Sequence, residues 1–483
     1  MADLYIWKYA LCHSERLIVR VIMAVEELHR ARAELDELEK QERCLVERLS
    51  EVRKAIQAQK LKIEDMGPPT INRFPIELLS QIFALCIPDP KSPEKPLHRI
   101  VSVSRRWRDI VWNNPSFWTS IKMMPIQPKK SLKKKLKRSQ KALLDIWIGD
   151  WDYRICDVHV MFHASLGAII PHADRWRSLT IDLDGMDMAF VECILRKLTH
   201  LSIPFLREFS MVINSYDDWH PYPYPDFLSP IRTPALQHLT LKAPLQFDTF
   251  MALPTLKTLH LTFTEADHPP PVISMPTPAQ SLTSLILDGD STEWSLKRNG
   301  LHLPLLEDLT LHLNRPMPFL EAIVAPKLRY VRCQTNDAVE FNTIEGKFRD
   351  IYDLSLDFWY GVDDRCAVSL CRAFPGVRRV RFSARDTPFF MAGIHGSGVL
   401  ERRPPIDQWL NLETLTLDDV SLQWLERWEL DDPIVKWLKG RQESGLSRLR
   451  VRLPKIKADE DRLPIYYALL GRHCDLEIFT SPT

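Results

Sequence analysis

A short apolar pattern recurs through the last two thirds of the chain and limits the folds that it can adopt. In each copy, an apolar residue is followed three positions later by a run in which every second residue is apolar. Such alternation places one face of a β-strand in a core and the other toward solvent. The copies begin at Trp176, Leu206, Leu236, Leu256, Leu282, Leu306, Leu328, Ile351, Val377, Leu412 and Leu446, with an earlier one at Leu144. No copy can bury its apolar face alone, so we expect the strands to stack on one another.

The copies lie about 20 to 35 residues apart, and with their Leu-x-x-Leu-x-Leu phase they resemble leucine-rich repeats. In that family an Asn follows the last Leu of the pattern. Asn214, Asn314 and Asn336 occupy this position, but most copies lack an Asn there. The resemblance therefore predicts an irregular leucine-rich-repeat solenoid over residues 144–483, a recognition array for a protein client. Another all-β or α/β stack of repeated units is the alternative.

A seven-residue repeat runs from Val21 to Met66, ahead of the strand pattern. Its first apolar position holds Val21, Leu28, Leu35, Glu42, Leu49, Ile56 and Ile63, and its second holds Ala24, Ala31, Leu38, Leu45, Val52, Gln59 and Met66. Neither Gly nor Pro interrupts it, which indicates a coiled coil. We predict a long helix over residues 1–66 that self-associates or binds a helical partner, in a parallel or an antiparallel pair. The alternative is a helix folded back onto the chain's own body.

Between these regions, Ile71 to Ile121 predicts two or three short helices. Pro75 suits a first helical turn. Apolar residues then recur at three- and four-residue spacing, as Ile76, Leu79, Ile82 and Phe83 in one helix and as Ile100, Val103, Trp107 and Ile110 in another. A unit of this size buries too little surface to stand alone. We therefore expect it to lean on a neighbouring region or on another protein.

These residues resemble an F-box, in the F-box-like form common in proteins of mushroom-forming fungi. The family pattern Leu-Pro-x-Glu-(Leu/Ile)-Leu-x-x-Ile-(Phe/Leu) is matched from Phe74 to Phe83, with Phe for the first Leu. Val-Cys-(Arg/Lys)-x-Trp-Arg is matched from Val103 to Arg108, with Ser104 where Cys is usual, and the closing Pro-x-(Leu/Phe)-Trp is matched from Pro115 to Trp118.

The resemblance implies that this unit binds a Skp-family adaptor and, through it, a cullin complex. The chain would then be the substrate-recognition subunit of a Skp-cullin-F-box type E3 ubiquitin ligase, with a protein client held on the repeats. The adaptor-binding residues carried over from the family are Phe74, Pro75, Ile76, Leu79, Ile82, Phe83, Ile100, Val103 and Trp107. The alternative is a scaffold without ligase function, which would gain support if Ile82 and Trp107 were fully buried within the chain.

A basic run is the main departure from an even charge balance. Lys129 to Lys141 contains eight basic residues and no acidic one, in a chain with a net charge of +1. The run could serve nuclear import or contact nucleic-acid phosphates. The favoured interpretation is a solvated amphipathic helix with Leu132 and Leu136 directed inward, and the absence of interleaved aromatic residues argues against nucleic acid as a partner.

The remaining residues do not predict a catalytic, metal or cofactor site. The nine cysteines are scattered without a Cys-x-x-Cys pair, which fits reduced thiols in the cytoplasm and/or nucleus. No apolar run reaches the roughly 18–20 residues of a membrane span. His159 and His163 lack a third ligand at metal-site spacing, and no glycine-rich phosphate loop is present. We therefore predict no cofactor, no metal and no enzymatic activity.

The expected organisation follows from these four regions. Residues 1–66 form the coiled-coil helix, 67–121 the F-box-like domain, 122–143 a basic linker and 144–483 the repeat array. The predicted class is α/β, with a long N-terminal helix, a small helical unit and an irregular leucine-rich-repeat solenoid.

Overall fold

The computed structural model describes residues 2–66, 71, 74–87, 95–125, 129–149, 151, 158–184, 188–214, 222–223, 225, 227–242, 245–246, 253–263, 280–291, 296–335, 340–359, 361–391, 403–420, 432–455 and 463–480. The chain divides into two compact units, Met1–Ile82 and Phe83–Thr483.

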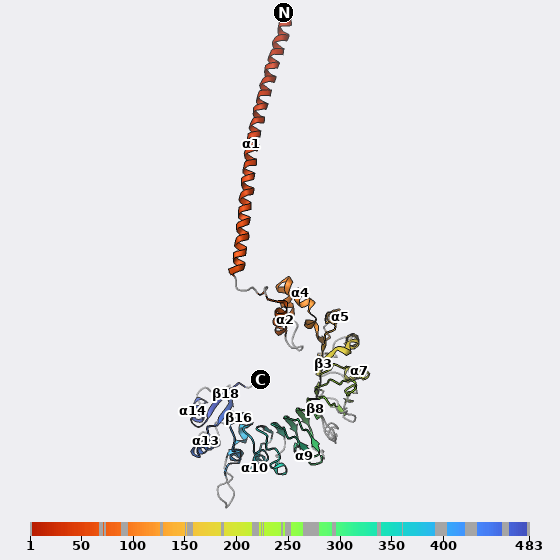
Figure 1. The fold of residues 1–483 in the computed structure, drawn as a ribbon, viewed down its shortest axis with the longest axis vertical. Helices are drawn as coiled ribbons and strands as arrows, with labels where there is room; N and C mark the ends of the chain where they lie inside the picture. Colours follow the sequence, from red (N-terminus) through yellow and green to blue (C-terminus); the bar gives the residue numbers. More distant parts are fainter. Residues whose placement is uncertain are drawn as a thin grey trace, which may run out of the picture. The chain divides into compact units, whose positions relative to one another are not determined.

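Helix α1 (Ala2–Met66) dominates the first unit as one helix of 65 residues. At a rise of 1.5 Å per residue it is about 97 Å long, and Figure 1 shows it unbroken. Leu, Ala, Glu, Lys and Arg are strong helix formers, and they make up most of its length. Each described side chain from Arg16 to Ile63 is exposed. Helix α2 (Ile76–Leu85) begins in this unit and ends in the second.

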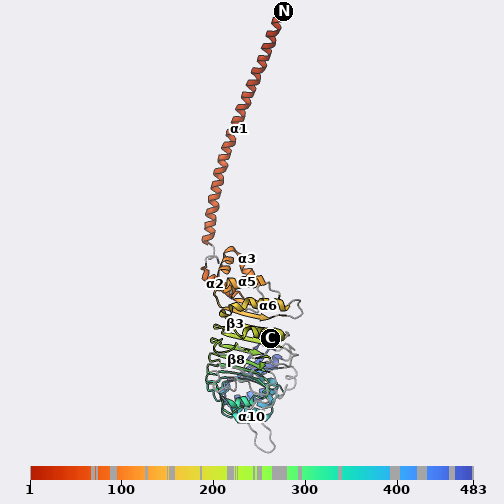
Figure 2. The same ribbon diagram turned by 90° about the vertical axis from the view of Figure 1, so that its right-hand side faces the viewer.

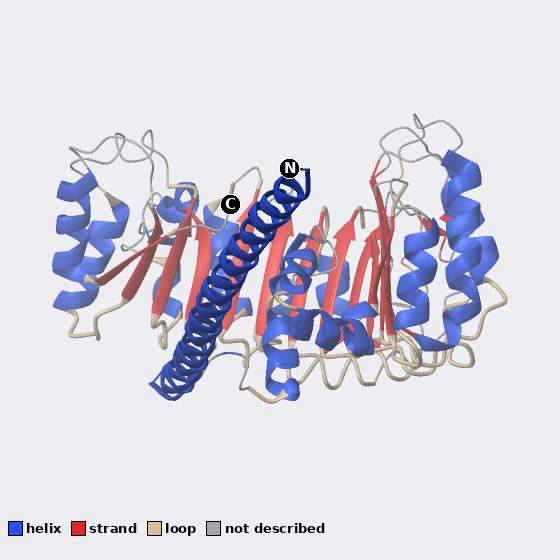
Figure 3. Ribbon diagram, turned by 90° about the horizontal axis from the view of Figure 1, so that it is seen from above, coloured by secondary structure: helices blue, strands red, loops and turns tan. Residues whose placement is uncertain are grey.

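A parallel sheet of 14 strands forms the second unit, and its strand order follows the chain. Figure 3 shows the strands side by side. The strands are β1 (Ser120–Met123), β2 (Leu144–Gly149), β3 (Trp176–Asp184), β4 (Glu208–Asn214), β6 (His238–Lys242), β8 (Thr258–Phe263), β9 (Ser284–Gly289), β11 (Asp308–Leu313), β13 (Tyr330–Thr335), β14 (Asp353–Phe358), β15 (Arg379–Ser383), β16 (Thr414–Asp418), β17 (Arg450–Pro454) and β18 (Asp475–Phe479). Two small sheets pair β5 (Tyr222–Pro223) with β7 (Leu245–Gln246) and β10 (Leu301–His302) with β12 (Ile323–Val324).

Helices cover the outer face of this curved sheet, as Figure 1 shows for α7, α9, α10 and α13. In the described part of the second unit, the helices are α3 (Lys95–Val103), α4 (Arg105–Asn113), α5 (Lys129–Arg138), α6 (Val158–Ile169), α7 (Met188–Leu198), α9 (Met317–Ala322), α10 (Asp364–Ala373), α11 (Thr387–Met391), α13 (Pro433–Glu443) and α14 (Leu463–His473), with short 3-10 turns such as η2 (Pro115–Trp118) and η5 (Ala384–Asp386). Figure 2 shows strands of the sheet lengthwise, with β3 above β8.

The pairing register of neighbouring strands explains how the apolar core forms. Leu285 of β9 pairs with Leu259 of β8 on one side and with Leu309 of β11 on the other, so leucines from successive strands form a continuous row. These side chains belong to one apolar core cluster that runs from Ile121 to Cys474. Because the strands are in register, the alternating residues between the leucines form a second face of the sheet, which is polar.

The prediction of an irregular leucine-rich-repeat solenoid was wrong. The predicted segments are strands, but they belong to one 14-stranded parallel α/β sheet that already begins with β1, upstream of residue 144. The apolar pattern records only that one face of each strand is buried, and any parallel sheet covered by helices on that face requires the same pattern. The basic segment predicted as a linker contains α5, which lies between β1 and β2 in the chain.

Candidate protein-interaction surfaces

Helix α2 carries the first half of the F-box-like pattern and exposes apolar side chains. The Pro75 carbonyl accepts the Leu79 N–H at 3.1 Å, and Glu77 lies in the first turn, near the positive end of the helix dipole. Ile76 is 54% exposed and Ile82 is 39% exposed. Large apolar side chains in solvent are single and scattered on most surfaces, and a group of them marks a contact site.

The second half of the pattern forms two helices that meet at Ser104. This residue has an extended backbone (φ −155°, ψ 164°), and its hydroxyl accepts the Trp107 N–H at 3.1 Å. Ser is among the best N-cap residues because its oxygen satisfies a free N–H of the first turn. Arg108 Nε also donates to the Val101 carbonyl at 3.2 Å, which ties α4 to α3. The Ser that departs from the family pattern therefore acts as the cap of α4.

Trp107 anchors α4 on the C-terminal end of α2. Its ring centroid lies 4.6 Å from that of Phe83, with the planes inclined by 50°. Phe83 is buried and Trp107 is half-buried. An aromatic pair of this geometry stabilises by about 0.5–1.5 kcal/mol beyond the area that it buries. Trp107 thus has a packing role and still keeps an accessible edge.

The structure divides the predicted adaptor-binding residues by exposure. Phe74, Pro75, Ile76, Ile82 and Val103 are exposed, whereas Leu79, Phe83 and Ile100 are buried. A buried side chain has no surface to offer another protein, so direct contact is restricted to the exposed residues and the edge of Trp107. The exposed Leu78, Leu85 and Trp112 were not predicted. In the sequence, these three positions could have been recognised only as apolar residues that lie outside the expected core face of their helix.

Helix α5 holds the basic run and packs into the sheet unit through its apolar side. Leu132 and Leu136 are buried, as the amphipathic interpretation predicted. The Arg138 guanidinium lies 4.4 Å from the centre of the Trp118 ring and 5.1 Å from that of Trp112. Arg138 therefore makes cation–π contacts, while the lysines that alternate with the leucines are exposed or half-buried.

The polar face of the sheet carries ion pairs between neighbouring strands toward its C-terminal end. Arg379 pairs with Asp353 at 2.8 Å. Arg381 makes two hydrogen bonds to Asp418, from Nε at 2.5 Å and from Nη2 at 2.9 Å. The bond to Asp418 raises the pKa of Arg381. Two parallel N–H···O bonds fix a guanidinium more firmly than one contact does, so this part of the face presents an ordered array of charges.

The central strands present a different surface on the same face. His260 and His312 lie there among threonines such as Thr258 and Thr310. Burial lowers the pKa of His260 to about 4, with a further contribution from Lys242. Burial also lowers the pKa of His312. Both imidazoles are therefore neutral at physiological pH, and charged side chains such as Lys242 and Asp288 lie near them.

No catalytic or metal constellation emerges from the histidines that the sequence singled out. His159 stacks on Phe190 with ring centroids 4.3 Å apart, and His163 Nδ1 lies 3.4 Å from Cys193 Sγ. Burial raises the pKa of Cys193, which favours the thiol over the nucleophilic thiolate. Within the described residues, no group of three or more His, Cys, Asp or Glu side chains could hold a metal ion.

Comparison with known proteins assigns no family. No protein-family model matches the chain, and no curated protein matches it. Among the helices in the described part of the chain, none combines the length and the hydropathy needed to cross a membrane.

Proposed function

We propose that this chain is the substrate-recognition subunit of a Skp-cullin-F-box type E3 ubiquitin ligase. The observation that carries the proposal is the set of exposed apolar side chains within the F-box-like pattern, above all Ile76, Ile82 and Val103. An isolated protein exposes such residues at a cost in solubility, and burial against an adaptor would remove that cost. The predicted location in the cytoplasm and/or nucleus belongs to the same proposal.

The exposure of two residues supports this function over a scaffold without ligase function, which would gain support if Ile82 and Trp107 were fully buried within the chain. Instead, Ile82 is exposed and Trp107 is half-buried. Both positions come from the family pattern, which carries them over as adaptor-binding residues.

The client would bind to the polar face of the sheet. Its ion-paired arginines and its neutral histidines offer a patterned surface to a folded protein or an extended segment, and shape and charge together select a partner. The mechanism is positional: a bound client is held near a ubiquitin-charged enzyme that other subunits supply, which raises the effective concentration of its lysines.

The test is co-purification of the full chain with a purified Skp-family adaptor. Wild type is expected to retain the adaptor at a one-to-one ratio. Ile82→Asp and Val103→Asp, each placing a charge in the apolar contact, are expected to weaken binding at least about 30-fold, which corresponds to the 2 kcal/mol or more lost at an interface hot spot. Binding is measured by isothermal titration calorimetry.

Ile231→Asp is the matched control because Ile231 is 89% exposed and lies outside the F-box-like pattern. It should bind the adaptor as wild type does. Circular dichroism and the melting temperature of each variant show whether the fold is intact. A folded wild type that retains no adaptor would overturn the proposal and leave the chain as a protein-interaction scaffold.

A further inference from the structure

Helix α1 exposes an apolar seam along most of its length. The seam residues of the heptad repeat are in solvent, with Leu28, Leu49 and Ile56 each at least 50% exposed. A helix that repeats its apolar residues every seven positions presents them as one continuous stripe. Burying an apolar stripe of this length requires a second helix packed along it.

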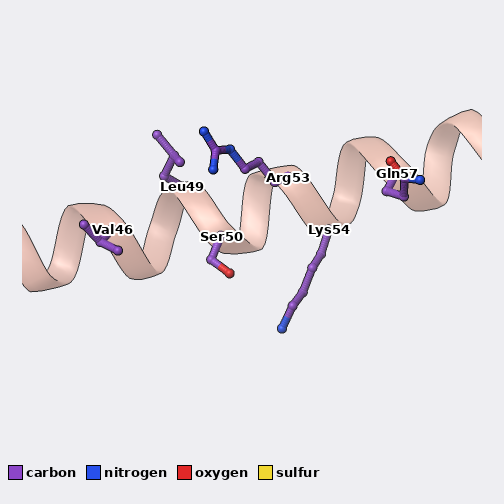
Figure 4. A pocket seen from close by; sticks show the side chains of 6 residues that line it. All are labelled: Val46, Leu49, Ser50, Arg53, Lys54 and Gln57. Carbon is purple, nitrogen blue, oxygen red and sulfur yellow. The ribbon is translucent and has the colours of Figure 1, made fainter.

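One hollow on the surface of α1 lies between residues of the seam. It is lined by Leu38, Gln41, Glu42, Leu45, Val46 and Leu49. A second hollow, shown in Figure 4, touches the seam only at Leu49 and otherwise lies on the flank of the helix; Leu49 and Arg53 project from one side there, and Lys54 projects from the opposite side. In coiled coils, a hole between such residues accepts a side chain of the facing helix.

The charge of α1 is divided along its length. Residues 26–47 contain eight acidic and four basic residues, a net charge of −4. Residues 48–66 contain five basic residues and three acidic residues, a net charge of +2. A second copy running in the same direction would place like charges together. A second copy running in the opposite direction would place the acidic segment on the basic one, so the complement of each half is present in the same helix.

The seam residues favour the same direction. In a parallel pair each layer contains the same residue twice, so Ala24 and Ala31 would leave gaps and Glu42 would face the partner's Glu42. If the whole repeat overlaps in an antiparallel pair, Ala24 meets the partner's Ile63 and Ala31 meets the partner's Ile56. Glu42 then meets the partner's Leu45. Small residues oppose large ones, and no layer contains two carboxylates.

The residues that flank the seam discriminate less strongly. A parallel pair contains one attractive combination, Glu27 with the partner's Arg32, and two repulsive ones, Glu34 with the partner's Glu39 and Arg48 with the partner's Arg53. The antiparallel pair contains one attractive combination, Glu27 with the partner's Lys62, and one repulsive combination between Arg32 and Arg53. Flanking charges of this kind set the orientation of coiled coils.

We propose that α1 is a homodimerisation helix that pairs antiparallel with α1 of a second copy, with Glu42 opposite the partner's Leu45 near the centre. The overlap from Val21 to Met66 spans about 69 Å. The arrangement sends the two copies' remaining chains to opposite ends of the paired helices. It is independent of adaptor binding, because it uses none of the residues of the F-box-like pattern.

The first experiment measures association of the full chain by sedimentation velocity over a range of concentrations. Wild type is expected to be a dimer, and Leu49→Asp is expected to shift the midpoint of association at least 100-fold toward the monomer, since it places a carboxylate opposite the partner's Leu38. Ser50→Asp is the matched control on the adjacent, non-seam position and should dimerise as wild type does. A wild type that stays monomeric at all concentrations overturns the proposal, whether the seam then binds another protein or the chain's own body.

The second experiment determines direction by disulfide formation between engineered cysteines, in a background where Cys44 and the other accessible cysteines are replaced by Ser. Ala31→Cys mixed with Ile56→Cys is expected to form a mixed disulfide under mild oxidation, because their layer brings the two backbones within reach of a bond. Neither variant alone should cross-link. Efficient cross-linking of Ala31→Cys with itself would establish a parallel pair and overturn the antiparallel arrangement.

Discussion

Helix α1 and the parallel sheet both contain regularly spaced leucines, but these are exposed in the helix and buried in the sheet. Leu49 of α1 is 51% exposed, whereas Leu311 of β11 is fully buried. The sheet closes its own core because its strands lie in register and helices cover one face. A single helix has no second layer of its own, so its seam can be buried only by contact with another part of the chain or with another molecule. Periodicity therefore predicts where a core forms, but not which chain completes it.

Removing one leucine from each region should give the largest contrast. Leu311→Ala is expected to lower the free energy of unfolding of the sheet unit by about 3 kcal/mol, because it leaves a cavity in a closed core. Leu49→Ala should leave that free energy unchanged. Urea unfolding followed by tryptophan fluorescence measures this, since every Trp except Trp7 lies beyond residue 82.

Equal losses of stability of the sheet unit from Leu311→Ala and Leu49→Ala would contradict this contrast between the two regions. That result would mean that the α1 seam is buried within the folded chain. A variant that retains the wild-type far-ultraviolet circular dichroism at low urea is required for either reading, because misfolding would also change the fluorescence.

A charge inside the closed core should produce the next largest effect. Asp386 of η5 is fully buried, and its Oδ1 lies 4.0 Å from Arg385 Nε. Burial raises the pKa of Asp386 to about 6, from a reference value of 3.8. The folded state therefore keeps a proton that the unfolded state loses between these values. Stability falls as pH rises through this window, and the full penalty is present above about pH 6.

Asp386→Asn removes the charge and should reverse this penalty. The variant is expected to gain on the order of 2 kcal/mol over wild type at pH 7, since one pKa unit corresponds to about 1.4 kcal/mol and the buried Asn amide keeps part of the desolvation cost. The difference should shrink toward pH 4. Urea unfolding of both proteins from pH 4 to 7.5 measures it, with the exposed Asp364→Asn as the control for net charge. A difference that does not vary with pH would contradict this account.

The polar face of the sheet should show the smallest effect on stability. Arg381 and Asp418 form two hydrogen bonds, but their side chains are 41% and 33% exposed. Exposed ion pairs of this kind contribute about 1 kcal/mol or less. Arg381→Ala is therefore expected to change the urea midpoint only slightly. A loss above about 2 kcal/mol would mean that this face holds the fold together and is not free for recognition.

The sequence predicted the elements better than it predicted their assembly. Alternation around Leu309 and Leu311 located β11, and helical spacing located α2 and α5. The assignment to a leucine-rich-repeat solenoid was wrong because the same alternation serves any one-sided parallel sheet. Ser104 was noted as a departure from the family pattern, but its role as a helix cap depends on a backbone conformation that the pattern does not specify.

For the candidate contact residues too, the sequence predicted the local geometry but not the burial of each side chain. Helical periodicity placed Ile76, Leu79 and Ile82 on one apolar face, and that local geometry follows from 3.6 residues per turn. It could not say that Leu79 would be buried while Ile76 and Ile82 would remain in solvent. Burial depends on which other elements lie over each side chain, and this is a property of the folded unit.

The amino-acid sequence by itself determined the length of α1, the positions of the strands and the polar or apolar character of each face, because these follow from local spacing and propensity. The tertiary structure decided that the strands join one sheet in chain order and that α5 lies between its first two strands. These outcomes depend on contacts between residues far apart in the chain, whose free energy no local pattern contains.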